Sequence, residues 1–189
     1  MNVILVGAST GGPGHIQRLL EALPADFRAA MVIAQHINAV FLPTLTADLD
    51  AHSRVMVRSG NEGDILKSGE ILFVHDKVGT IEKDRSGNLR LGVCRQECEH
   101  TPSVNALFRS AAMCIDDPRR WMAALLTGIG DDGAVGLGAL RTAGVATIAE
   151  SEESAVVFGM PRTAIEIGAA QEVLPLDRII DRIIAFGGF

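Results

Sequence analysis

Apolar runs alternate with segments of helical periodicity along most of the chain. Runs that are largely apolar are typical of strands covered on both faces, and they lie at 2–7, 29–35, 54–57, 121–127 and 145–150. Apolar residues that recur every three or four positions predict helices at 13–23, 41–49, 133–142 and 176–184, with two more beginning after Ser103 and at Pro161. Strands that alternate with helices in this way indicate a parallel sheet with helices on both faces.

The middle of the chain has a different pattern. Short runs at 70–74, 78–83 and 88–93 are separated by polar turns, which is typical of hairpins rather than of strand–helix units. We therefore expect a doubly wound α/β fold, a mainly parallel sheet flanked by helices, with an antiparallel hairpin insertion that makes the sheet mixed. The length of 189 residues and the absence of linker-like stretches predict a single domain over 1–189.

Charge and composition narrow the classes of function. The net charge is −6 and no block of Lys and Arg stands out, so binding to nucleic acid is not indicated. The apolar run at the N-terminus is too short for a signal peptide or a membrane span. Three cysteines without a paired CxxC motif favour a reducing compartment, the cytoplasm. A metal site at Cys94, Cys98 and His100 is a disfavoured alternative, because zinc frameworks are tighter and have four ligands.

The first candidate for chemistry is Ser9 in the sequence Gly7-Ala8-Ser9-Thr10-Gly11, which matches G-x-S-x-G between a predicted strand and a predicted helix. Small residues beside the serine permit a sharp turn that presents Oγ above the sheet. The following helix N-terminus offers N–H groups to a developing oxyanion. The motif alone fits equally well a glycine-rich turn that packs closely or binds phosphate.

Two further polar groups follow predicted strands. His36 comes directly after the second strand and is a natural general base near neutral pH, although a lone histidine at a strand end is more often structural. Asp131 or Asp132 could orient the imidazole while the other caps a helix. The carboxyl ends of parallel strands meet at one edge, so we expect these groups near Ser9. His15, on the first predicted helix, is expected at the surface.

A dinucleotide-binding oxidoreductase is an alternative, because Gly7, Gly11 and Gly14 open a helix after a strand. Such folds carry an acidic residue about 20 positions later, and residues 35–38 contain none. The chain also lacks tyrosine, which short-chain dehydrogenases would need for catalysis. The three candidate residues occur along the chain in the order Ser–His–Asp, whereas α/β-hydrolases have the order Ser–Asp–His. An ordinary α/β-hydrolase is therefore not indicated.

Five stretches in chain order resemble a known family, the catalytic domain of CheB, the protein-glutamate methylesterase of bacterial chemotaxis. They are GASTGG (7–12), AQHI (34–37), TPSVNALFRSAA (101–112), LLTGIGDDGAVG (125–136) and ATIAESEESAVVFGMPRTAIEIGAAQEVLPL (146–176). The resemblance implies a doubly wound, mainly parallel sheet. It also implies hydrolysis of methyl esters on receptor glutamates with release of methanol, and in some members deamidation of receptor glutamines.

The resemblance also implies a role for each site residue. By motif match Ser9 would be the nucleophile, His36 the base and Asp132 the orienting acid, since the family pattern places its aspartate immediately before Gly133. The substrate or oxyanion vicinity would comprise Thr10, Gly11, Ile129 and Gly130. The implied two-step acyl transfer requires no metal and no organic cofactor.

The implied partners are methylated cytoplasmic helices of chemoreceptors, with a separate receiver domain or histidine kinase as a further candidate. The family's usual receiver domain does not precede the first strand, which begins at Asn2, so we expect a stand-alone enzyme or an excised domain. Departures from the family at VHDKVG (74–79) and HTPSVN (100–105) are expected to affect the cleft rim and receptor specificity rather than the triad. A catalytically inactive module that binds receptors or signalling partners is the alternative function.

Overall fold

Seven parallel strands form the central sheet of the computed structural model, which describes residues 1–95 and 99–188. From one edge to the other they are β3 (Met56–Ser59), β4 (Glu70–Phe73), β2 (Ala30–Gln35), β1 (Val3–Ala8), β7 (Trp121–Leu125), β8 (Ala146–Glu150) and β9 (Glu172–Leu174). Each strand pairs in parallel with its neighbours. The central strands β1 and β2 are buried throughout, as their apolar sequences predict.

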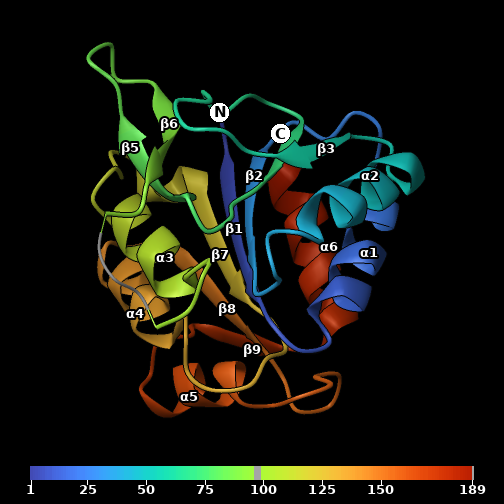
Figure 1. Cartoon of the computed structure of the whole chain (residues 1–189). Coiled ribbons are helices and arrows are strands. Elements are labelled where there is room, and N and C mark those ends of the chain that lie inside the picture. The colour runs from blue at the N-terminus through green and yellow to red at the C-terminus, as the bar shows by residue number, and fades with distance from the viewer. Residues whose placement is uncertain (96–98, 189) are drawn as a thin grey trace.

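Helices cover both faces of the sheet (Figure 1). One face carries α1 (Gly12–Ala22), α2 (Leu42–His52) and α6 (Leu176–Gly187), and the other carries α3 (Val104–Ala112), α4 (Ala134–Thr142) and α5 (Met160–Glu166). A short 3-10 helix, Pro118–Arg120, precedes β7. Because side chains alternate along β1, Val3 and Leu5 enter the core under α3 and α4, whereas Ile4 and Val6 enter the core under α1 and α6.

The predicted α/β fold with an antiparallel hairpin insertion is confirmed, but the sheet is not mixed. The hairpin of β5 (Val78–Lys83) and β6 (Leu89–Val93) is a separate two-stranded sheet that contacts α3. The segment 70–74 was expected in a hairpin, and instead β4 pairs in parallel with β2 and β3. Its four residues are all buried, and a short apolar run does not disclose which strand it will pair with.

The predicted helices are all present within a few residues of their expected bounds. The apolar stripe of α6 is buried against the sheet at Leu176, Ile179, Ile180 and Ile183, as expected for a docked amphipathic helix. The sequence analysis missed β9, which has three half-exposed residues and pairs with β8 alone. No helix in the part of the chain that the structure describes is long and apolar enough to cross a membrane.

The topology gathers four strand ends at one edge of the sheet. The strands β2, β1, β7 and β8 are consecutive neighbours and parallel, so their carboxyl ends lie together, at the lower edge in Figure 1. Ser9 follows β1 and His36 follows β2. Ligands of doubly wound folds bind beyond such an edge, and the predicted chemistry lies there.

Gly7, near the end of β1, lies where α3 approaches the sheet. A Cβ at this position would stand 2.3 Å from Cγ1 of Val104 and 3.0 Å from Cδ1 of Leu125. We expect Gly7→Ala to lower the free energy of unfolding by about 1–3 kcal/mol, the usual cost of overpacking a core. Urea unfolding of the variant and the wild type measures this change.

Gly14 in α1 provides the matched control, because a Cβ there would meet no atom within 4 Å. Gly14→Ala should raise the free energy of unfolding by about 0.5–1 kcal/mol, since alanine restricts the unfolded chain and favours the helix. Equal destabilisation by the two substitutions would contradict the packing explanation for Gly7.

Candidate active site

Ser9, His36 and Asp132 form a connected chain of hydrogen bonds at the carboxyl edge of the sheet. Oγ of Ser9 lies 3.1 Å from Nδ1 of His36, and Nε2 of the same ring lies 2.8 Å from Oδ2 of Asp132. The structure thus brings together the three side chains that the sequence analysis singled out. The Asp132 side chain is 3% exposed and that of His36 is 15% exposed, while Ser9 is only partly buried. Asp132 is therefore the buried end of this chain of hydrogen bonds.

Ser9 occupies a tight turn between β1 and α1 that is held from both sides. Its N–H donates to the carbonyl of Thr127 at 2.9 Å, and its carbonyl accepts from the N–H of Gly12 at 2.8 Å. The carbonyl also accepts from Nε2 of Gln35 at 2.9 Å. Gly11 adopts a φ of +84°, a conformation that favours glycine, and this lets the chain enter α1 immediately after the serine.

Gln35 links the serine and histidine turns, a role that the sequence analysis did not assign. The side chain is 2% exposed, and its Nε2 donates to the carbonyls of both Ser9 and His36, at 2.9 and 3.0 Å. The N–H of His36 donates to the carbonyl of Ala8 at 3.0 Å. An amide side chain at the end of an otherwise apolar buried strand was the available signal in the sequence.

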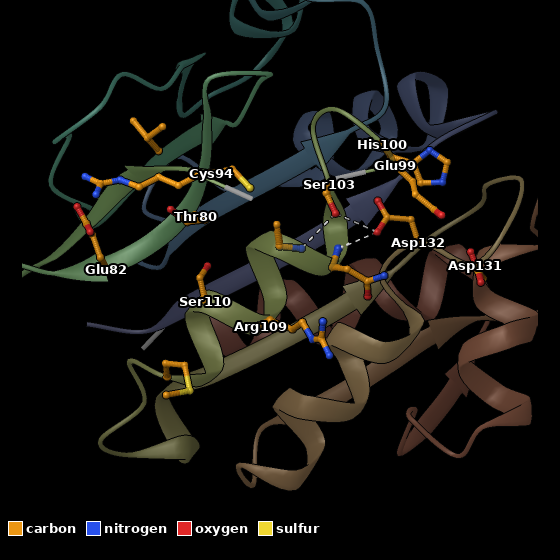
Figure 2. Close-up of a pocket in the computed structure, with 15 residues that line it drawn as sticks. Thr80, Glu82, Cys94, Glu99, His100, Ser103, Arg109, Ser110, Asp131 and Asp132 are labelled. Atoms are coloured by element: carbon orange, nitrogen blue, oxygen red, sulfur yellow. Dashed lines mark hydrogen bonds between the residues drawn. The ribbon is translucent and has the colours of Figure 1, made fainter. Parts of the chain in front are cut away.

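Asp132 is held by the N-terminus of α3 (Figure 2). Oδ2 accepts from the N–H of Val104 at 2.8 Å, and Oδ1 accepts from the N–H of Asn105 at 2.9 Å and from Oγ of Ser103 at 3.2 Å. Burial raises the pKa of the Asp132 carboxyl, but hydrogen bonds from His36 and from these backbone amides outweigh burial and hold the pKa below its ordinary value. The helix N-terminus also favours negative charge, so Asp132 is ionised at neutral pH.

The segment 100–105 lies closer to the triad than expected. Ser103, which lies in the stretch that matches the family, and the backbone amide of Asn105 bind Asp132 directly; that the departures in this segment affect the cleft rim and receptor specificity stays a prediction. The ring centroid of His100 lies 4.8 Å from that of His36. The physical reason is that α3 begins at residue 104, so its first amides are directed at the buried carboxylate. Asp131, the other candidate for orienting the histidine, is exposed.

Two turns with unused backbone donors flank the serine. The N–H groups of Thr10 and Ile129 donate to no acceptor within residues 1–95 and 99–188. A Cβ at Gly128 would stand 2.8 Å from Cβ of Ser9, so only glycine permits this close approach of the turn after β7. Gly130 continues the turn with a φ of +83°. The four residues predicted for the substrate or oxyanion vicinity therefore lie in these two turns.

A cleft of about 850 Å³ opens beside Asp132 between the β5–β6 hairpin and α3 (Figure 2). Its lining includes Asp132 and His100 but, of the described residues, neither Ser9 nor His36. Glu82 lies on the hairpin side and Arg109 on the α3 side. The cleft thus continues from the acid end of the triad along α3 and carries charges of both signs.

A buried pair, His15 and Glu150, lies behind the serine turn. His15 was expected at the surface, but it is 7% exposed, because it lies on the face of α1 that packs towards the end of β8. Glu150 is completely buried, and its carboxylate accepts from the N–H of Thr127 at 2.8 Å. The sequence analysis assigned neither residue a role, although a carboxylate at the end of an apolar strand was a signal for Glu150.

In the part of the chain that the structure describes, no group of three or more His, Cys, Asp and Glu side chains is placed to hold a metal ion. The alternative metal site of the sequence analysis included Cys98, which lies outside the described residues. Cys114 is buried.

The family model of the CheB methylesterase matches residues 4–183. The "Protein-glutamate methylesterase/protein-glutamine glutaminase 2" of Carboxydothermus hydrogenoformans is 41% identical to this chain over 96% of its length. The protein of the same name numbered 6 from Anaeromyxobacter dehalogenans is 41% identical over 97%. The chain covers 52% and 54% of these two proteins, so it spans about half the length of the curated relatives it matches.

The CheB methylesterase catalytic domain of Thermotoga maritima, a crystal structure, has the same fold. The two structures superpose with a TM-score of 0.90 at 29% sequence identity, and the match covers 97% of each chain. The family model, the relatives at about 40% identity and this solved structure agree over nearly the whole sequence. The chain therefore belongs to the CheB methylesterase family.

Proposed function

We propose that this chain is a serine hydrolase that removes methyl esters from glutamate residues of chemoreceptors and releases methanol, and that the same site deamidates receptor glutamines. The observation that carries the proposal is the continuous hydrogen-bonded chain from Ser9 through His36 to Asp132. The names of the relatives, which join a glutamate methylesterase to a glutamine glutaminase, support this choice of substrates. The assigned roles are nucleophile for Ser9, general base for His36 and orienting acid for Asp132.

The ionised Asp132 determines which nitrogen of His36 acts as the base. A carboxylate accepts hydrogen bonds only, so Nε2 of His36, 2.8 Å away, carries the proton. Nδ1 is then unprotonated and accepts the hydrogen bond from Oγ–H of Ser9. In chymotrypsin-like proteases the two nitrogens exchange these positions. The chemistry is the same, because the unprotonated nitrogen of neutral imidazole accepts the proton in either tautomer.

The first half-reaction forms an acyl-enzyme. Oγ of Ser9 attacks the ester carbonyl carbon while its proton passes to Nδ1 of His36. The tetrahedral intermediate collapses, the bond to the methoxy oxygen breaks, and His36 protonates that oxygen to release methanol. A glutamine side chain reacts in the same way and releases ammonia.

The second half-reaction regenerates the enzyme. Water attacks the glutamyl ester of Ser9 with His36 as base, and the proton then returns to Oγ as the glutamate carboxylate leaves. The negative oxygen of both tetrahedral intermediates needs backbone donors. The unused N–H groups of Thr10 and Ile129, in the two turns beside the serine, support their assignment as oxyanion-hole donors.

Beyond the ester, the substrate is a receptor helix in our proposal. The cleft along α3 continues from Asp132 and is lined by charged side chains, which suits the polar surface of a methylated cytoplasmic helix. We further propose that residues 1–189 act as one catalytic domain in the cytoplasm and that a separate receiver domain or histidine kinase regulates it. A binding module without catalysis is the rival function, and the intact triad geometry favours the enzyme.

Ser9→Ala tests the nucleophile. The variant should lose at least three powers of ten in the rate of methanol release from membranes that carry methylated chemoreceptors, as other triads do. Release measured for the wild type and the variant, with both proteins shown to be folded by circular dichroism, checks the prediction.

Ser86→Ala is the matched control, because Ser86 is exposed in the hairpin turn. The rate of methanol release by this variant should equal that of the wild type. A loss of less than about tenfold in Ser9→Ala would rule out Ser9 as the nucleophile. Absence of release from the wild type across the receptors of the source organism would favour the binding module.

Asp132→Asn tests the charge at the N-terminus of α3. The folded pKa of Asp132 is below its ordinary value of about 4, so the carboxylate contributes fully to stability above pH 4. That contribution disappears as the pH falls through the folded pKa. The variant lacks it at every pH. The free energy of unfolding of Asp132→Asn should therefore be about 1.5–3 kcal/mol lower than that of the wild type at pH 7. This difference should narrow below pH 4, as measured by urea unfolding of both proteins across this range.

The exposed neighbour supplies the control for Asp132. Asp131→Asn should change the free energy of unfolding by no more than about 0.5 kcal/mol at either pH, as exposed substitutions do. A gap for Asp132→Asn that stays constant from pH 7 to pH 3 would show that the loss does not come from the carboxylate charge.

A further inference from the structure

Glu150 carries a completely buried carboxylate at the end of β8, directly behind the serine turn. Its side chain has an exposed fraction of 0%. Burial of a carboxylate is costly unless hydrogen bonds and a countercharge compensate it. Oε2 accepts from the N–H of Thr127 at 2.8 Å, and Oε1 accepts from Oγ of Ser154 at 2.7 Å.

His15 supplies the remaining partner. Its Nδ1 lies 3.4 Å from Oε2 of Glu150, and the side chain is 9% exposed. This nitrogen is buried and forms no hydrogen bond among the described residues, so its contact with Glu150 is a close approach of two polar groups rather than a hydrogen bond. The imidazole of α1 and the carboxylate of β8 therefore face each other as a buried pair. Among the described residues, no hydrogen bond or ion pair joins either side chain to Ser9, His36 or Asp132.

Thr127 connects this pair to the nucleophile. Its N–H binds Glu150, and its carbonyl accepts the N–H of Ser9 at 2.9 Å. Its hydroxyl donates to the carbonyl of Thr10 at 2.8 Å and accepts from the N–H of Val157 at 2.9 Å. One residue, Thr127, therefore separates the Glu150 carboxylate from the turn that presents Oγ of Ser9.

Ser154 extends the connection to the opposite side. Its Oγ donates to Glu150 and accepts from the N–H of Leu176, the first residue of α6, at 2.8 Å. The Glu150 carboxylate thus binds the turn after β7 through Thr127 and the loop after β8 through Ser154, and Ser154 in turn binds the start of α6. A displacement of this carboxylate would move the Thr127 peptide and, with it, the serine.

We propose that Glu150, with His15 as its counter-group, is a positioning residue for the nucleophile. Through Thr127 it fixes the peptide units of Ser9 and Thr10, and thereby the direction of the serine Oγ and of the Thr10 N–H. The inference rests on the proposed function of Ser9. In this proposal the buried pair affects the reaction rate although neither residue contacts the substrate.

Hydrolysis of p-nitrophenyl acetate and the rate of labelling by a fluorophosphonate probe test the proposal in the full chain. Glu150→Leu leaves the N–H of Thr127 and the hydroxyl of Ser154 without their acceptor. It should lower kcat on the order of 100-fold, the effect of a misplaced reacting group, and leave KM within about twofold. Glu150→Gln retains an oxygen for Thr127 and should stay within about threefold of the wild type.

Glu70 provides the matched control for loss of a buried carboxylate. It is 7% exposed and accepts from Nε of Arg58 at 2.7 Å, and it begins β4 at the opposite end of the sheet from the site. Glu70→Leu should lower the Tm and leave kcat per folded enzyme unchanged. If Glu150→Leu lowers the Tm and likewise keeps its kcat per folded enzyme, the pair is only structural and the proposal is overturned.

His15→Leu keeps the proposal testable where Glu150→Leu does not fold. His15→Leu removes the polar group that lies 3.4 Å from Oε2 of the completely buried Glu150, and kcat should fall by about tenfold or more, because a buried polar group that loses its partner disturbs its surroundings. Adding Glu150→Gln replaces the buried carboxyl group by an amide and should restore most of the rate, a non-additive result that marks a coupled pair. Equal rates for the single and double variants would overturn the proposal.

Failure of the proposed function gives a different result. If fluorophosphonate does not label the wild type, Ser9 is not a hydrolase nucleophile, and both proposals fall together. If the wild type is labelled, and the Glu150 and His15 variants keep their kcat per folded enzyme as Glu70→Leu does, the esterase proposal stands. The positioning role alone is then refuted.

Discussion

The parallel hydrogen bonding of β2, β1, β7 and β8 is the constraint on which the rest of the site depends. In a parallel arrangement every carboxyl end lies at the same edge, so the residues that follow these strands meet although they are far apart in sequence. His36 follows β2, Ser9 follows β1, and Asp132 lies in the turn beyond β7. Reversal of any one strand would carry its functional residue to the opposite edge of the sheet.

A site at a sheet edge must satisfy many polar groups away from water, and here side chains and backbone satisfy one another. Asp132 accepts two amides of α3, Glu150 accepts the Thr127 amide, and Gln35 donates to the carbonyls of Ser9 and His36. Each of these bonds removes the cost of an unpaired buried group and at the same time fixes a turn. Stabilisation of the fold and orientation of the reacting groups are therefore the same set of interactions.

The fold class and the candidates Ser9 and His36 could be predicted because their signals are local, whereas the choice of Asp132 over Asp131 depended on the family resemblance. A buried strand, the residue after it and a glycine-rich turn are each visible in a few adjacent positions, as at Ser9 and His36. The pairing of β4, the separation of the hairpin from the sheet and the burial of His15 depend on which faces pack together across long sequence distances. The backbone amides that bind Asp132 leave no mark in the sequence, since every residue but proline carries one.

The chemistry sets two opposed demands on Ser9, and the structure meets them with different atoms. In the proposed reaction the hydroxyl must be accessible to an ester carried by another protein, whereas the backbone must not shift when that protein binds. The peptide units on both sides of Ser9 are held by Thr127, Gly12 and Gln35, while the only hydrogen bond of Oγ among the described residues is the one with His36. Because accessibility belongs to the side chain and rigidity to the main chain, the proposed substrate helix would approach the turn without disturbing the geometry of the proposed attack.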